Sequence, residues 1–161
     1  MRLQKAASSA AFRVTFRLSS LHWFFMAFEI HEREREGIAL FDVVGRLIVG
    51  PNVGALRERV EQTVAAARIN IVLNLVGVDY IDSTGLGTMV MLFRTAQKAG
   101  GALKLLNLNR RELELLVLTK LTTVFDIFND EQDVLNSFYP DREIKRFDIL
   151  SFIKQTQEEG M

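Results

Sequence analysis

The chain contains no cysteine, which excludes disulfide bonds, thiolate metal ligands and thiol catalysis. Its two histidines, His22 and His31, are too few for most histidine-based metal sites. We therefore expect no metal and no other cofactor. An absence of cysteine also fits a reducing compartment, so we expect a cytoplasmic protein.

An excess of charge of either sign is also missing. Lysine and arginine together number 20, aspartate and glutamate together number 20, and the formal net charge is zero. Nothing in this balance would attract a phosphate backbone, so direct nucleic-acid binding is disfavoured. The apolar run at residues 21–25 is far shorter than the ~20 residues of a membrane-spanning helix, so no membrane span is expected there.

The first 25 residues differ in composition from the rest of the chain. Their charged residues are all basic, namely Arg2, Lys5, Arg13 and Arg17. An acid-free leader rich in arginine and serine is typical of a targeting segment, but we favour a translation start at Met26, with targeting and ordinary packing as the alternatives. We expect residues 1–25 to be a basic N-terminal extension that adds nothing to the fold, followed by one domain at 26–138 and a helical tail at 139–161.

Apolar spacing between residues 28 and 138 alternates between strand-like and helix-like periods. Residues 28–49 predict an edge strand, a turn and a buried strand, with the charged run 31–36 as the solvated part of the hairpin. The later segments predict a helix at 53–67, a buried strand at 69–76, a helix from 83, a strand at 102–107, a helix starting after Asn109, and a short strand or turn at 122–128. Such alternation predicts an α/β fold with a mostly parallel sheet.

Two helix starts can be read directly from the sequence. Asn109 followed by Glu112 predicts a reciprocal capping box, and Asp130 predicts the cap of a last domain helix that runs through Val134 and Leu135. Gly100-Gly101 predicts the end of the preceding helix.

The segment Asp82-Ser83-Thr84-Gly85-Leu86-Gly87 stands where a buried strand passes into a helix, which is where α/β sheets present functional residues. Val90 breaks the dinucleotide-binding glycine pattern, and Ile81 stands where a nucleophile elbow requires glycine. No histidine is close in sequence to act as a general base, so we expect no enzyme. What remains is a helix start with a capping Ser83 or Thr84 preceded by an acid, and glycines that allow another backbone to approach.

Residues 27–138 resemble a STAS domain. Asn74-Leu75, followed by Tyr80-Ile81 and the segment 82–87, is similar to the signature of bacterial anti-sigma factor antagonists. The resemblance implies a STAS-type fold, with a mixed, mostly parallel sheet of about four or five strands, about four helices and, outside the resemblance, a C-terminal amphipathic helix.

The resemblance also implies a function. In this family an anti-sigma factor that is a serine/threonine kinase phosphorylates the serine after the aspartate, here Ser83, and a metal-dependent Ser/Thr phosphatase restores it. The chain would then be a phosphorylation-controlled partner-switching protein in transcription regulation. One departure is that family members under strict kinase control commonly carry an acidic residue after Gly-x-Leu, where this chain has Ile48 after Gly45-Arg46-Leu47. The alternatives are a STAS subunit of another complex, such as a lipid or solute transporter, without phosphorylation, and an enzyme or small-ligand receptor.

A second apolar face is predicted on the helix that begins at Ser83. The core stripe is expected at Leu86, Met89, Val90, Phe93 and Ala96, and the second face at Thr88, Met91, Leu92 and Thr95. This face would dock the partner, or else pack under the following loop or the tail. The expected partner-binding residues are Asp82, Thr84, Gly85, Leu86, Gly87, Thr88, Met91 and Leu92.

The tail shows a separate amphipathic pattern. Ile144, Phe147, Leu150 and Ile153 share one stripe between residues 142 and 157, which predicts a helix that packs on the domain or on a second copy.

Overall fold

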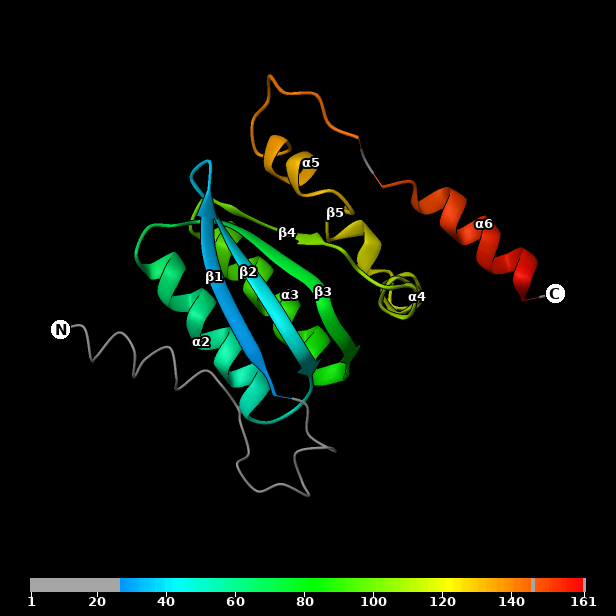
Figure 1. Ribbon diagram of the computed structural model, residues 1–161, viewed down its shortest axis with the longest axis horizontal. Coiled ribbons are helices and arrows are strands. Elements are labelled where there is room, and N and C mark those ends of the chain that lie inside the picture. Colours follow the sequence, from blue (N-terminus) through cyan, green and yellow to red (C-terminus); the bar gives the residue numbers. More distant parts are fainter. Residues whose placement is uncertain (1–26, 146, 161) are drawn as a thin grey trace.

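The computed structural model describes residues 27–145 and 147–160, so the predictions for the leader at 1–25 lie outside the described residues. Five strands form one sheet in the order β1-β2-β3-β4-β5 (Figure 1). They are β1 (Glu29–Arg35), β2 (Ile38–Leu47), β3 (Asn70–Ile81), β4 (Ala102–Leu106) and β5 (Ile127–Phe128). β1 is antiparallel to β2, and the other neighbouring strands are parallel, which confirms the predicted mixed, mostly parallel sheet.

The helices of the described residues lie on both faces of this sheet. They are α2 (Pro51–Ala65), α3 (Ser83–Lys98), α4 (Arg110–Leu118), α5 (Glu131–Asn136) and α6 (Ile149–Glu159), with a 3₁₀ turn at Leu121–Thr123. α2 and α3 lie side by side behind the sheet in the view of Figure 1, and α5 lies over its other face. None of these helices combines the length and apolar character that crossing a bilayer would need.

Side chains that alternate along each strand divide the interior into two clusters. Ile71, Leu73 and Leu75 of β3 join the larger cluster together with α2 and α3, whereas Val72 joins the smaller cluster under α5. Because both faces of β2 and β3 are covered along much of their length, their sequences read as nearly continuous apolar runs.

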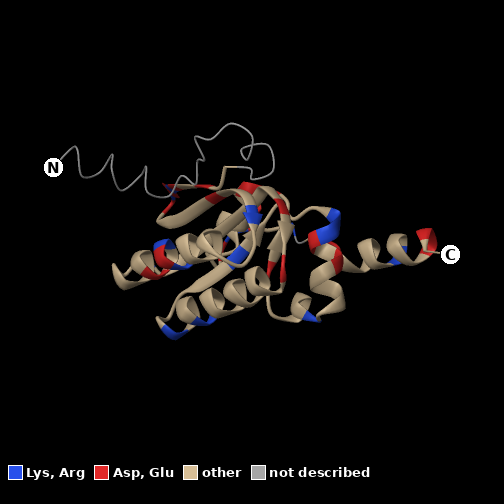
Figure 2. Ribbon diagram, turned by 90° about the horizontal axis from the view of Figure 1, so that it is seen from below, with Lys and Arg blue, Asp and Glu red and all other residues tan. Residues whose placement is uncertain are grey.

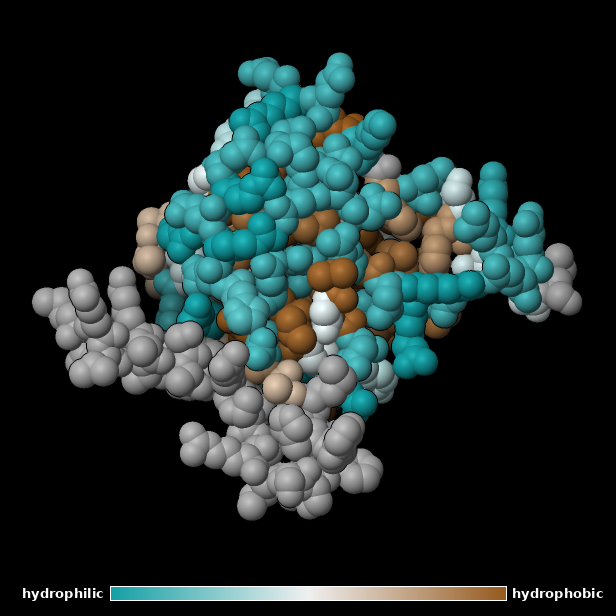
Figure 3. Space-filling view, in the orientation of Figure 1, coloured by the Kyte–Doolittle hydropathy of each residue, from teal (hydrophilic) through white to brown (hydrophobic). Residues whose placement is uncertain are grey.

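α5 covers only part of its face of the sheet. Beyond it an apolar area lies within a hydrophilic surround (Figure 3). Val76 of β3 belongs to this face, because it alternates with the core residue Leu75, and it is 72% exposed.

Two of the predicted helix caps are confirmed. Asn109 accepts a hydrogen bond from the Glu112 N–H at 2.8 Å, while the Glu112 carboxylate accepts from the Asn109 N–H at 3.0 Å. Asp130 likewise accepts from the Asp133 N–H at 2.9 Å and begins α5. These interactions involve residues three apart, so the sequence alone specifies them.

The charged run at 31–36 is more than the solvated part of a hairpin, which corrects the prediction. On one face of β1, Arg33 is bonded to Asp42 and also pairs with Glu131 of α5. On the other face, Glu32 pairs with Arg59 and Arg68, and its side chain is only 19% exposed. The alternating residues of β1 therefore attach the edge strand to α5 on one side and to the α2 side on the other.

The predicted tail helix begins later than expected. Asp148 caps α6 by accepting from the Ser151 N–H at 3.1 Å, so Ile144 and Phe147 lie before the helix. Phe147, Ile149 and Phe152 pack against the larger cluster, but Leu150 is 72% exposed, so the predicted stripe is wrong at that residue. Because the helix starts at a later residue than predicted, a different set of its residues faces the domain.

The central strand β3 is also longer than predicted. It continues past residue 76 to Ile81, with pairing to β2 that shifts register near Val44 and Gly45. This extension leads directly into the segment at 82–87.

Candidate functional site

The segment at 82–87 connects the end of β3 to the first turn of α3. β3 ends at Ile81, and Ser83 is the first residue of the helix. The segment therefore lies at the carboxyl edge of the parallel strands, as predicted.

The helix cap differs from the prediction. Asp82, rather than Ser83 or Thr84, is the N-cap, and its Oδ1 accepts a hydrogen bond from the Gly85 N–H at 2.7 Å. Its Oδ2 accepts from the Val49 N–H at 2.8 Å, so one carboxylate binds amides from two separate segments. Aspartate competes well with serine as a cap, and here it leaves both hydroxyls out of the cap.

The side chains of Ser83 and Thr84 are exposed, and within the described residues neither makes a hydrogen bond. Ser83 thus presents an unbonded hydroxyl at the positive end of a helix of 16 residues. Such a hydroxyl is accessible to a modifying enzyme without local unfolding.

Gly85 allows a close backbone approach, but the approaching backbone is the chain's own. A Cβ at this position would lie 2.2 Å from the Leu47 carbonyl oxygen, because the first turn of α3 packs on the last residue of β2. Gly85 is buried and hence does not line an open approach for a partner, which corrects the prediction. Gly87 is exposed, and a Cβ there would meet nothing within 4 Å.

The second face of α3 is only partly as predicted. Leu92 is fully buried in the larger cluster, so its placement on the exposed face is wrong. Met91 is 37% exposed, and Thr88 and Thr95 lie beside it with hydroxyls that donate to the carbonyls of the preceding turn. Leu86 is buried in the core. The accessible surface of this face therefore comprises the exposed Ser83, Thr84, Gly87 and Met91 together with the half-buried Thr88.

Little charge lies on α3 itself. Its charged residues are Arg94 and Lys98, both toward its C-terminal end, and the rest of the helix is uncharged in Figure 2. Elsewhere acidic and basic residues are interspersed over the described elements. The surface next to Ser83 is thus suited to apolar and polar contacts more than to ion pairing.

Sequence reasoning missed the loop between β2 and α2. Val49, in this loop, is 69% exposed and is fixed through its N–H to Asp82. The two residues lie 33 positions apart, so no local pattern could have paired them.

Asn74, part of the resemblance signature, lies in a polar cluster beside the core. It is 8% exposed, donates to Asp42 at 2.8 Å and accepts from Asn107 at 3.1 Å. These bonds connect β2, β3 and the end of β4, and give Asn74 a structural role.

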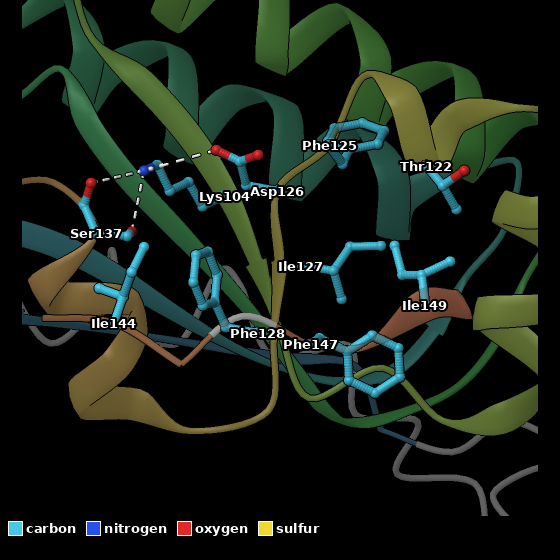
Figure 4. Close-up of a pocket in the computed structure, with 10 residues that line it drawn as sticks. All are labelled: Lys104, Thr122, Phe125, Asp126, Ile127, Phe128, Ser137, Ile144, Phe147 and Ile149. Atoms are coloured by element: carbon cyan, nitrogen blue, oxygen red, sulfur yellow. Dashed lines mark hydrogen bonds and ion pairs between the residues drawn. The ribbon is translucent and has the colours of Figure 1, made fainter. Parts of the chain in front are cut away.

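One cavity of about 260 Å³ lies between the edge of the sheet and the tail (Figure 4). Phe125, Phe128 and Phe147 are among its walls. Lys104 reaches into it, but its ammonium group donates to the Ser137 carbonyl and hydroxyl oxygens at 3.0 Å and lies 3.7 Å from Asp126. The ammonium group of Lys104 is thus already bonded within the fold.

His31 is on β1, where its Nε2 lies 2.9 Å from the Glu29 carboxylate. It makes no bond with the segment at 82–87, so no base–serine pair forms among the described residues. Over that same part of the chain, no group of three or more His, Cys, Asp or Glu side chains could hold a metal ion.

The site thus places an exposed serine at the start of a helix that the preceding aspartate caps, at the edge of a mixed sheet. The STAS domain model matches residues 29–134, and the chain belongs to the STAS domain family.

Two curated relatives indicate the same family. The anti-sigma-B factor antagonist of Listeria monocytogenes is 31% identical over 111 residues, which cover 68% of this chain and 94% of that protein. The anti-sigma-B factor antagonist of Bacillus subtilis is 48% identical over 50 residues, which cover 31% of this chain and 46% of that protein. The resemblance to the anti-sigma factor antagonist family is thereby confirmed.

Solved structures confirm the fold. An anti-sigma factor antagonist from Mycobacterium paratuberculosis superposes with a TM-score of 0.62 at 19% identity, over 69% of this chain and 93% of that one. The Bacillus cell fate determinant SpoIIAA in its phosphorylated form gives 0.55 at 17% identity, over 69% and 98%. The tail beyond residue 138 lies outside the STAS domain match.

Proposed function

We propose that this chain is an anti-sigma factor antagonist that binds an anti-sigma factor serine/threonine kinase and is switched by phosphorylation of Ser83. In the unmodified state the chain captures the kinase and so frees a sigma factor for transcription. Phosphorylation by the same kinase ends the capture, and a metal-dependent Ser/Thr phosphatase reverses it. The chain acts by binding, not catalysis, in the cytoplasm.

The observation that carries this proposal is the exposed, unbonded Ser83 hydroxyl at the first position of α3. The names of the relatives support the choice of partner. Ser83, Thr84, Gly87, Thr88 and Met91 form the contact surface, with Asp82 holding the helix start behind them.

Electrostatics explain how one phosphate would switch binding. Phosphorylation adds about −1.5 to −2 charges, which a helix N-terminus tolerates, so the fold survives. The capping amide of Gly85 is already occupied by Asp82, so the new charge stands outward beside a carboxylate. A negatively charged or desolvated group of the partner would then be repelled by several kcal/mol. A loss of about 3 kcal/mol already lowers the affinity by about two orders of magnitude.

The test compares Ser83→Ala, Ser83→Asp and Thr84→Ala against each purified anti-sigma factor kinase of the source organism. Ser83→Ala should bind the kinase without release when ATP is present, and Ser83→Asp should bind at least about 100-fold more weakly. Thr84→Ala is the matched control, because Thr84 is exposed next to Ser83, and it should be phosphorylated like the wild type. Mass spectrometry should place the phosphate on Ser83.

The second candidate is a STAS subunit of another complex that uses this surface without phosphorylation. Ile48, in the position where an acidic residue accompanies strict kinase control, favours it. Equal binding by Ser83→Asp and the wild type, or labelling of Thr84 alone, would select this candidate over the phosphorylation switch.

A further inference from the structure

The loop between β2 and α2 presents an apolar side chain to solvent. Val49 is 69% exposed, although a loop residue with no packing role is usually polar. It is followed by Gly50, whose φ of 118° is a conformation that L side chains rarely adopt. The loop therefore has a defined shape that directs Val49 outward.

Three hydrogen bonds hold the loop and its flanks. The Val49 N–H donates to Asp82 at 2.8 Å, the Asp82 N–H donates to the Leu47 carbonyl at 3.0 Å, and Asn52 donates to the Arg46 carbonyl at 2.9 Å. Two of these three bonds involve the residue immediately before Ser83. The loop and the start of α3 are consequently one rigid surface, although 33 positions separate Val49 from Asp82.

We propose that Val49 is a specificity-determining contact of the antagonist surface, and that Asp82 is the positioning residue that holds Val49 beside Ser83. The inference rests on the proposed function, and it adds the chemistry of the partner. The kinase surface that meets Val49 is an apolar depression, because an exposed valine held in one place gains affinity where its side chain leaves water. Met91, which follows Ser83 on α3 and is also exposed, adds a second apolar side chain to this contact.

The carboxylate of Asp82 suits this role because it has two oxygens to accept two amides. Asp82→Asn keeps one accepting oxygen, and asparagine is itself a good N-cap, so α3 still begins at the same residue. Its other terminal atom is an NH₂ group, which cannot accept from the Val49 N–H. This substitution thus removes the bond to the Val49 N–H and keeps the cap of α3.

The first test measures amide hydrogen exchange by NMR in the protein alone. In Asp82→Asn, the Val49 amide should exchange on the order of tenfold faster than in the wild type. Asp130→Asn is the matched control, because Asp130 caps α5 through a single amide, and it should leave the Val49 amide unchanged. Unchanged exchange in Asp82→Asn would overturn the positioning role.

The second test measures affinity for the kinase that phosphorylates the wild-type chain. Val49→Lys should weaken binding about tenfold or more, while Val76→Lys should bind as the wild type does. Val76 is the matched control because it is a valine of nearly the same exposure, 72%, on the sheet face opposite α3. Both variants should keep the wild-type circular dichroism spectrum.

A double-mutant cycle then separates positioning from simple structural support. Val49→Ala should cost less affinity in the Asp82→Asn background than in the wild type, because the released loop no longer presents the side chain. Additive losses would show that Asp82 acts independently of Val49, which contradicts the proposal. If no kinase binds the wild type, the proposed function fails and this inference fails with it. If the wild type binds, and Val49→Lys has the same affinity for the kinase as Val76→Lys, the inference alone is overturned.

Discussion

Replacing Glu112 with glutamine should stabilise this protein at alkaline pH and leave it unchanged in acid. Glu112 is 3% exposed at the start of α4, and its Oε2 accepts from the Asn109 N–H while its Oε1 has no hydrogen-bond partner in the described residues. Burial raises the pKa of Glu112 from 4.5 to about 7, the Asn109 N–H opposes this rise, and the nearby Asp79 adds to it. Glutamine imitates the protonated form and retains an oxygen for the capping box.

The direction of this pH dependence of stability follows from the raised pKa of Glu112. Below pH 4.5 the carboxyl is protonated in both the folded and the unfolded chain, so it adds no pH dependence. Between pH 4.5 and about 7 the folded chain retains a proton that the unfolded chain has lost, and stability falls as pH rises. Above pH 7 the loss is complete and amounts to about 3 kcal/mol, at 1.36 kcal/mol for each pKa unit.

The assay is urea unfolding of the wild type and Glu112→Gln at pH values from 4 to 8.5. The two free energies of unfolding should agree at pH 4 and differ by about 2–3 kcal/mol at pH 8.5, in favour of the variant. Glu114→Gln is the matched control on the same helix, because Glu114 makes only an exposed pair with Arg110, and its effect should stay within about 0.5 kcal/mol. A difference that does not change with pH would refute the reasoning.

Three further outcomes are expected. The two arginines of β1 lower the pKa of Glu131 to about 2, so wild-type stability should fall as pH drops from 4.5 toward 2, and urea unfolding of Glu131→Gln should show a weaker dependence over that range. Gly85→Ala should lower the free energy of unfolding by at least about 2 kcal/mol, because its Cβ would lie 2.2 Å from the Leu47 oxygen, whereas Gly87→Ala, which meets nothing within 4 Å, should change it by less than about 1 kcal/mol. Met91→Lys should abolish kinase capture in a pull-down and keep the wild-type circular dichroism spectrum; a collapsed spectrum would show that Met91 belongs to the core.

Local chemistry determined much of this fold. The caps at Asn109 and Asp130 and the change from helical to strand spacing depend on residues a few positions apart, and each was correctly predicted. The same holds for the place of Ser83 at a strand–helix junction.

Which apolar face of α3 is buried could not be read from spacing. Met91 and Leu92 are adjacent and both apolar, so a helical pattern with two apolar stripes fits either orientation. Packing against the sheet and α2 buries Leu92 and leaves Met91 partly exposed. The role of the charged run of β1 could not be read from the sequence either, because its ion pairs with α2 and α5 exist only after those helices have packed.

By itself the sequence determined the order of the elements, the helix starts at Asn109 and Asp130 and the candidate serine, because these depend on backbone geometry and on neighbours within one turn. Only the tertiary structure decided what surrounds Ser83. Asp82 binds an amide three residues away and another 33 positions away, and the second bond requires β2 and β3 to be paired in register. That pairing places Val49 beside the start of α3, because parallel strands bring distant residues to the same edge of the sheet.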